Sequence, residues 1–153
     1  MKPLLVLTLL LPLFTGCQEQ PKNFFGRTGT IVLRQPTKIE AWRIHADAAT
    51  PAKELDIAMG RQLAKILESP STFDFTMAKG CKFDPIAGFR LTRDKRVIEV
   101  LLCFHCNELK LISPDPVSKR YPSRIADFDP GRAELVKFIK QVFPDDQEIQ
   151  GLQ

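Results

Sequence analysis

The sequence has few of the residues on which much enzyme chemistry depends: it contains two histidines, one tryptophan and one tyrosine. It has no glycine-rich phosphate loop, no Gly-x-Ser-x-Gly nucleophile elbow and no His-Glu-x-x-His zinc motif. Because the histidines are only His45 and His105, a histidine-dependent site has few options. No internal repeat and no basic stripe interleaved with aromatic residues occurs, so we do not expect a nucleic-acid partner.

The chain also has only a small excess of one sign of charge. The formal net charge is +4, from 22 lysines and arginines against 18 acidic residues, and the positive residues are scattered. Only Arg93 to Arg96, which reads "RDKR", is dense, and such a run is typical of a solvated hairpin tip. A mild basic excess of this kind could favour acidic lipid headgroups or glycans, but it does not indicate a specific ligand.

A long hydrophobic run is missing too, although a short one opens the chain. Lys2 precedes an apolar stretch from Leu4 to Phe14, which has the charge and length of a signal-peptide core. A transmembrane helix needs about 20 apolar residues, so this stretch is too short to be one. We therefore predict that residues 1–16 form a signal peptide.

The end of this stretch reads "LFTGC" and resembles the lipobox of bacterial lipoproteins, although Phe14 stands where that family prefers leucine. The resemblance implies cleavage before Cys17 and attachment of acyl chains to it, and two or three chains anchor a protein stably. Gln18 instead of aspartate implies, in a Gram-negative cell, the periplasmic face of the outer membrane. The expected partner is thus the membrane, through the lipid, and an envelope protein is a second candidate. The alternative is an ordinary secretory signal in which Cys17 has no role.

The remaining chain has the length of one domain. We expect residues 17–28 to form a polar tether after the lipidated cysteine. A single α+β domain is expected over 29–146, followed by a frayed tail at 147–153. The first strands are predicted at 30–33 and 38–44, where β-branched and aromatic residues are common.

Two helices and a three-strand meander make up the predicted domain. The first helix, 51–68, has Thr50 as its expected N-cap, and the second, 130–143, has Asp129. The meander covers about 88–112, and its middle strand is so apolar that we expect it to be covered on both faces. The fold class is therefore α+β, with an antiparallel sheet packed against two helices.

Three cysteines remain if Cys17 is lipidated: Cys81, Cys103 and Cys106. In an oxidising compartment this odd number leaves one disulfide with a free thiol, or a metal site that uses all three. The favoured interpretation is a disulfide that ties a loop to the sheet and contributes about 3 kcal/mol. A zinc knuckle is the second interpretation, with His105 or His45 as a fourth ligand and Asn107 in a left-handed conformation after the Cys-x-x-Cys turn.

Thiol-disulfide catalysis is the third interpretation. "CFHC", from Cys103 to Cys106, is similar to the Cys-Pro-His-Cys motif of periplasmic oxidants of the thioredoxin family. That family places its motif at the start of a helix, whereas the strand-like "ELKLI" follows here.

The stretch from "CKFDPIAG" to "CFHC" also resembles small secreted or lipid-anchored bacterial proteins of uncharacterised role. In those proteins the loop tends to read Pro-Arg-His-Gly, but here Pro85 to Gly88 contains no histidine. This resemblance implies no known activity. We expect a binding or structural role without catalysis or a required cofactor. The alternatives are a zinc-binding module and a periplasmic thiol-disulfide oxidoreductase.

Overall fold

The computed structural model of the chain describes residues 21–46, 48–76, 79–113 and 123–153. Cys17 and the expected signal peptide lie outside these residues. Within them, the chain forms, in order, α1 (Pro21–Arg34), β1 (Lys38–His45), β2 (Ala48–Ala49), β3 (Lys53–Glu54), α2 (Ile57–Glu68), a 3-10 turn (Pro70–Thr72), β4 (Ala87–Arg93), β5 (Arg96–Cys103), β6 (Glu108–Ile112), β7 (Ser123–Asp127), a second 3-10 turn (Asp129–Gly131), α3 (Arg132–Val142) and α4 (Gln147–Gln150).

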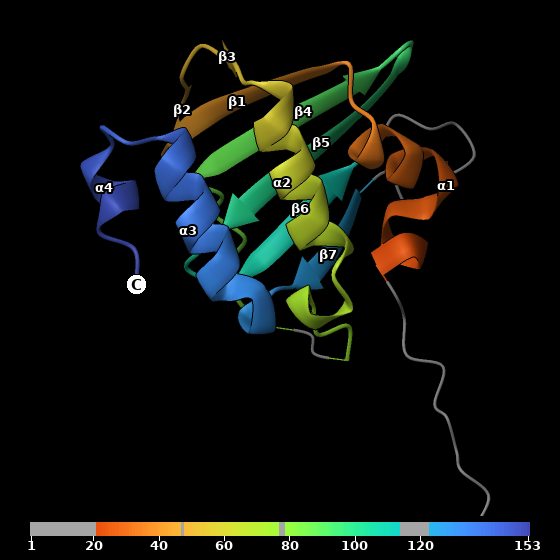
Figure 1. The fold of residues 1–153 in the computed structure, drawn as a ribbon. Helices are drawn as coiled ribbons and strands as arrows, with labels where there is room; N and C mark the ends of the chain where they lie inside the picture. The colour runs from red at the N-terminus through yellow and green to blue at the C-terminus, as the bar shows by residue number, and fades with distance from the viewer. Residues whose placement is uncertain (1–20, 47, 77–78, 114–122) are drawn as a thin grey trace, which may run out of the picture.

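All strand pairs of the described sheet are antiparallel, and the strand order is β2-β1-β4-β5-β6-β7, with β3 also paired to β1. Figure 1 shows α3, α2 and α1 side by side on one face of this sheet, with α4 beside α3. The predicted α+β class and the predicted meander, β4 to β6, are confirmed. The "RDKR" stretch is the β4–β5 turn, as expected.

The core lies between the helices and the inner face of the sheet. Alternate residues of β4 and β5 point into it, because successive side chains of a strand face opposite sides. Phe89, Ile98 and Val100 are fully buried there, while Arg90 and Glu99 on the other face are partly exposed. The helices lie on one face only, and Val97, Glu99 and Leu101 on the other face of β5 are partly exposed. The expectation that this strand is covered on both faces is therefore wrong.

The outer face carries one close approach of a side chain to the backbone. Trp42 on β1 pairs in register with Gly88 on β4. A Cβ added to Gly88 would lie 2.3 Å from the Cε2 and Cζ2 atoms of the Trp42 ring. The indole therefore occupies the space above Gly88, and the guanidinium of Arg90 lies 5.5 Å from its ring centroid.

We expect Gly88→Ala to push the indole off the sheet and to lower the free energy of unfolding by about 1–3 kcal/mol, the usual cost of overpacking. Trp42 is the single tryptophan, so its fluorescence should shift to longer wavelength as the ring becomes more exposed. The matched control is Gly80→Ala, because a Cβ there would have no atom within 4 Å. If both variants unfold at the same urea concentration and emit alike, the close approach has no energetic role.

The N-terminal part of the domain differs from the expectation. The predicted strand at 30–33 is helical, and most of the predicted tether at 17–28 belongs to α1, which is kinked at Gly26 (φ 66°). Phe24 and Phe25 are 3% and 4% exposed and contact the ring of Phe73, so the chain is part of the core there. Burial of the two aromatic rings outweighs the polar composition around them.

The helix predicted at 51–68 starts later than expected. Thr50 does not cap it: its hydroxyl accepts a hydrogen bond from the Arg43 backbone N–H at 3.0 Å, and its own N–H donates to the Arg43 carbonyl. Residues on either side of Pro51 form β2 and β3 against β1 instead. Asp56 is the actual N-cap, accepting from the N–H of Ala58 at 2.7 Å.

The last helix and the tail also differ in detail. Asp129 is not the N-cap of α3, because a 3-10 turn precedes the helix and Gly131 takes the cap position without a side-chain bond. The tail expected to fray contains α4, capped by Asp146, whose carboxylate accepts from the N–H of Ile149 at 2.9 Å. Ile149 is fully buried, and this apolar contact holds the tail on the domain.

Candidate functional site

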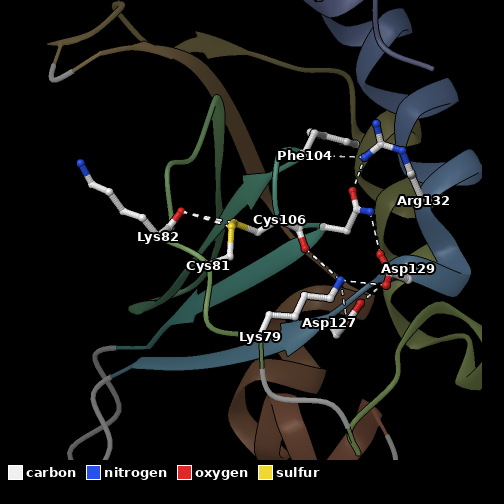
Figure 2. The surroundings of a disulfide bond; sticks show 9 residues. Lys79, Cys81, Lys82, Phe104, Cys106, Asp127, Asp129 and Arg132 are labelled. Atoms are coloured by element: carbon white, nitrogen blue, oxygen red, sulfur yellow. Dashed lines mark hydrogen bonds and ion pairs between the residues drawn. A yellow bond between two sulfur atoms is a disulfide. The ribbon is translucent and has the colours of Figure 1, made fainter.

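The three cysteines do not act as one group. The structure joins Cys81 to Cys106 with a Cα–Cα distance of 6.0 Å, within the range usual for disulfides. Cys103 is a free, fully buried cysteine. The favoured interpretation, that two of the three cysteines pair and tie the loop to the sheet, therefore agrees with the structure, and the pair is not the one within the Cys-x-x-Cys motif (Figure 2).

The position of Cys106 is set by the turn between β5 and β6. Asn107 follows it with φ of 54°, the left-handed conformation expected from the sequence, which asparagine adopts more readily than most residues. Its carbonyl accepts from the N–H of Phe128, and its side-chain Nδ2 donates to Asp129 Oδ1 at 2.6 Å. The turn that carries the disulfide is thereby fixed to the segment before α3.

Lys79 connects the disulfide loop to the same segment. Its Nζ lies 2.8 Å from Asp127 Oδ2 and 2.8 Å from Asp129 Oδ2, and it donates to the Cys106 carbonyl at 2.9 Å. The Asp127 side chain is 2% exposed. One ammonium therefore contacts a buried carboxylate, an exposed carboxylate and the backbone of a disulfide cysteine, as Figure 2 shows.

Arg132, at the start of α3, completes the network. It donates to the Phe104 carbonyl at 2.8 Å, bonds Asn107 Oδ1, and lies 5.7 Å from the centroid of the Phe104 ring. Its Nε donates to the carbonyl of Gln153 at 2.9 Å. These bonds hold the "CFHC" turn against α3 and the C-terminal residue. We name the set Lys79, Cys81, Cys106, Asn107, Asp127, Asp129 and Arg132 the disulfide cluster.

The charges of the cluster shift its pKa values. Hydrogen bonds from Lys79 and from Asn107 lower the pKa of the Asp129 carboxyl below its usual 3.8. Burial on its own would lower the pKa of Lys79, but the hydrogen bonds to Asp127 and Asp129 outweigh it, so this pKa is raised above 10.5. Both shifts favour the charged pair near neutral pH.

We expect Asp129 to contribute to acid sensitivity. A carboxyl whose pKa is lower in the folded than in the unfolded chain stabilises the fold above its unfolded value of about 3.9, and loses this effect as the pH falls through the folded pKa. The urea midpoint of the wild type should therefore fall below about pH 4, and Asp129→Asn should fall less over the same range. Asp94→Asn, at the exposed hairpin tip, is the control. An identical acid-side fall in Asp129→Asn and in the wild type would contradict this prediction.

The other ligand candidates lie apart from the cysteines. His45, at the end of β1, and His105, in the β5–β6 turn, are both exposed, and neither is hydrogen-bonded to a cysteine among the contacts of the described residues. In the described part of the chain, no group of three histidine, cysteine or acidic residues is arranged to hold a metal ion. Two of the three proposed zinc ligands, Cys81 and Cys106, are bonded to each other instead.

The thiol-disulfide interpretation lacks its structural context. The "CFHC" residues end β5 and enter a hairpin turn, so neither Cys103 nor Cys106 stands at the start of a helix, as the motif of that family does. The disulfide sulfur of Cys106 has the carbonyl oxygen of Lys82 as a neighbour at 3.2 Å. What this geometry supports best is a cross-link that secures the loop before β4 to the sheet.

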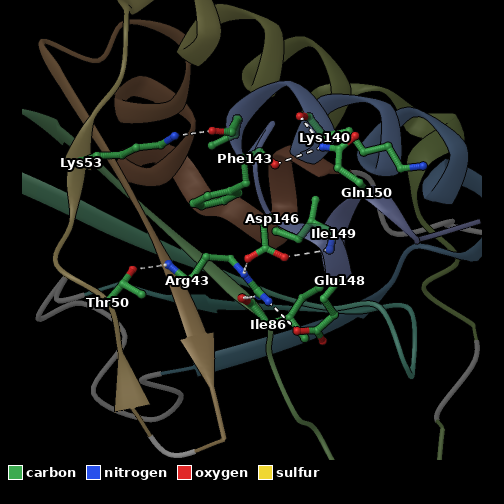
Figure 3. A network of polar contacts seen from close by, with 11 residues as sticks. Arg43, Thr50, Lys53, Ile86, Lys140, Phe143, Asp146, Glu148, Ile149 and Gln150 are labelled. Atoms are coloured by element: carbon green, nitrogen blue, oxygen red, sulfur yellow. Dashed lines mark hydrogen bonds and ion pairs between the residues drawn. The ribbon is translucent and has the colours of Figure 1, made fainter.

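A second polar network was missed from the sequence. Arg43 on β1 is 3% exposed; its Nε bonds Asp146 at 2.6 Å and its Nη2 bonds Glu148 at 2.7 Å (Figure 3). Its Nη1 also donates to the Ile86 carbonyl. Burial on its own would raise the pKa of Asp146, but the Ile149 N–H and Arg43 outweigh it and lower the pKa. In "KIEAWRIH", Arg43 alternates with Ile39 and Ala41 on the core side of β1. This alternation is the feature of the sequence from which a buried arginine could have been predicted.

A shallow groove of about 340 Å³ lies between the end of α2 and the start of α3. Its walls are of mixed polar and apolar character and include Lys65, Ser69 and Glu134. Ser69 and Ser71 hydrogen-bond to each other across 2.8 Å, so these hydroxyls partly satisfy one another. The groove offers no cluster of catalytic groups.

Comparison with protein-family models, with curated proteins and with solved structures finds no match for this chain. Among the described residues, no helix has both the length and the apolar character needed to cross a bilayer.

Proposed function

We propose that the chain is an exported bacterial protein, anchored in the cell envelope by lipid on Cys17, whose folded domain is a binding or structural module. The observation that carries this proposal is the Cys81–Cys106 pair, because structural disulfides are typical of oxidising compartments outside the cytosol. The apolar run from Leu4 to Phe14 would direct the chain to such a compartment. The "LFTGC" sequence supplies the anchor.

The disulfide cluster supports a structural role for the cysteines. Lys79 makes three polar contacts, and Arg132 and Asn107 also direct their polar groups to neighbours within the domain. These groups bind the chain itself, and Cys103 is buried. The domain would thus stay folded in a compartment that lacks the ATP-dependent chaperones of the cytosol. Such stability suits a protein that presents a fixed surface to a partner in the envelope.

The proposal is tested by the mass of the protein from bacterial membranes, produced from the full sequence. We expect a chain that begins at Cys17, carries diacylglycerol and an amide-linked acyl chain, and is two hydrogens lighter than its reduced form. Cys17→Ser should remove the lipid, while Cys103→Ala should keep it. An unprocessed chain beginning at Met1, with all cysteines open to alkylation, would overturn the proposal.

A further inference from the structure

The distance between the proposed anchor and the folded domain is short. Helix α1 begins at Pro21, which is itself buried, and its first turn places Phe24 and Phe25 in the core. Three residues lie between Cys17 and Pro21, which makes four steps along the chain, and an extended chain covers at most about 3.5 Å per step. The Cα atoms of these two residues can therefore be no more than about 14 Å apart. A lipidated Cys17 leaves no room for the domain to stand away from the bilayer.

The surface nearest to this attachment point is basic. Helix α1 contains Lys22, Arg27 and Arg34 and no acidic residue. Arg34 pairs with Glu68, whereas Lys22 and Arg27 are exposed and form no ion pair with any residue that the structure describes. Charges of this kind are attracted to anionic lipid headgroups.

An exposed apolar residue lies next to Arg27. Ile31 follows Arg27 by four residues, so the two side chains are neighbours on one face. Ile31 is 37% exposed and is one of two large hydrophobic side chains that are exposed in the described part of the chain; the other, Ile125, is on β7. Arg124, next to it, donates to the carbonyls of Asn23 and Phe24 and so fixes β7 to the start of α1.

We propose that Lys22, at the start of α1, and the neighbours Arg27 and Ile31, beyond the kink at Gly26, rest on the anionic lipid surface of the membrane in which Cys17 is anchored. The inference deepens the proposed function and rests on lipidation of Cys17. Contact at this end orients the domain: in Figure 1 α1 and α4 lie on opposite sides of the molecule, so α3 and α4 would face away from the bilayer. The side of the domain open to an envelope partner is then the one carrying α3 and α4.

The test uses the full lipidated protein in vesicles of 70% zwitterionic and 30% anionic phospholipid, with acyl chains brominated near the headgroup to quench tryptophan. Trp42 gives the baseline for the wild type. Ile31→Trp adds a reporter on the proposed contact, and Lys137→Trp adds one on the exposed side of α3. We expect at least twofold stronger quenching in Ile31→Trp than in Lys137→Trp, and less quenching at high salt.

Charge reversal provides the second arm. In the Ile31→Trp protein, Lys22→Glu with Arg27→Glu should at least halve the additional quenching. The control pair, Lys137→Glu with Lys140→Glu, both on α3, changes the net charge equally and should leave the quenching unchanged. The additional quenching should also weaken in vesicles made only of zwitterionic lipid.

Each outcome decides a different claim. A mass without lipid on Cys17 overturns the proposed function and this inference together. Lipid on Cys17 with equal quenching in Ile31→Trp and Lys137→Trp overturns the membrane contact alone, and would leave the α1 face to a protein partner. If neither the charge reversal nor the lipid charge changes the quenching, the electrostatic contact with anionic lipid is also overturned.

Discussion

Replacing Cys81 and Cys106 together by serine should lower the free energy of unfolding by about 3 kcal/mol. The disulfide joins residues 25 apart, and a cross-link of that span restricts the unfolded chain enough for an effect of this size. Its removal should also loosen the start of the loop before β4, which Lys79 would then hold, while Ile86 at the other end keeps its backbone bond to Leu102. The measurement is urea unfolding of the oxidised wild type and of the double variant.

Reduction supplies the internal control. A thiol reductant should lower the urea midpoint of the wild type nearly to that of the double variant and should leave the double variant unchanged. Cys103→Ala should keep the sensitivity to reductant and lose only about 1 kcal/mol of buried contact. If reduction does not change the wild-type midpoint, the Cys81–Cys106 bond does not contribute to the stability of the fold.

Lys79→Met should cost about as much as loss of the disulfide. The substitution leaves the Asp127 carboxylate, 2% exposed, without its counter-charge, and breaking one side of a buried ion pair typically costs 3–5 kcal/mol. The Lys79 side chain is 21% exposed, and Asp127 keeps a hydrogen bond from the N–H of Asp129 at 2.7 Å. We therefore expect a loss near the lower limit, about 3 kcal/mol, measured by urea unfolding at pH 7.

A double-mutant cycle separates the ion pair from packing. Adding Asp127→Asn to Lys79→Met should recover part of the lost stability, because the buried site then holds no unpaired charge. Lys137→Met, at an exposed lysine on α3, should change the stability by less than about 0.5 kcal/mol. A double variant that is less stable by the sum of its single losses would show that Lys79 and Asp127 do not interact energetically.

The meander could be predicted because its signals are local. "GFRLT", "VIEVLLCF" and "ELKLI" alternate or are β-branched, and the charged "RDKR" between the first two strands marks a turn. β4, β5 and β6 follow in the expected order and at nearly the expected bounds. The second helix likewise shows its apolar stripe in the sequence, with Leu135, Phe138 and Ile139 buried.

The N-terminal helix could not be predicted in the same way. Residues 21–34 contain two glycines and two threonines, which lower helix propensity, and "TIVL" is typical of a strand. Tertiary contacts decide the outcome: Val32 and Leu33 are fully buried, and α1 contacts α2, β4 and β5. Local propensity has no access to such contacts, which join α1 to segments that follow it by more than 20 residues.

The sequence predicted which cysteines belong to the candidate site, but not which two of them form the disulfide. The sequence identified Cys81, Cys103 and Cys106, and three connectivities were open. The position of each cysteine in the fold decides between them. Cys103 is the last residue of β5 and pairs with Glu108 inside the sheet, whereas Cys106 lies in the turn after β5, where it meets Cys81. Lys79 and Asp127 were missed because a buried ion pair between a loop and a strand leaves no periodic signal.

Burial of Arg43 depends on residues that are synthesised much later than β1. Arg43 is among the first residues of the sheet to be synthesised, yet its carboxylate partners, Asp146 and Glu148, are among the last. Until those residues have left the ribosome or a translocation channel, the guanidinium lacks the charges that permit its burial. Closure of the domain around β1 must therefore wait for Asp146 and Glu148, so a nascent or partly translocated chain that lacks them cannot reach the native state.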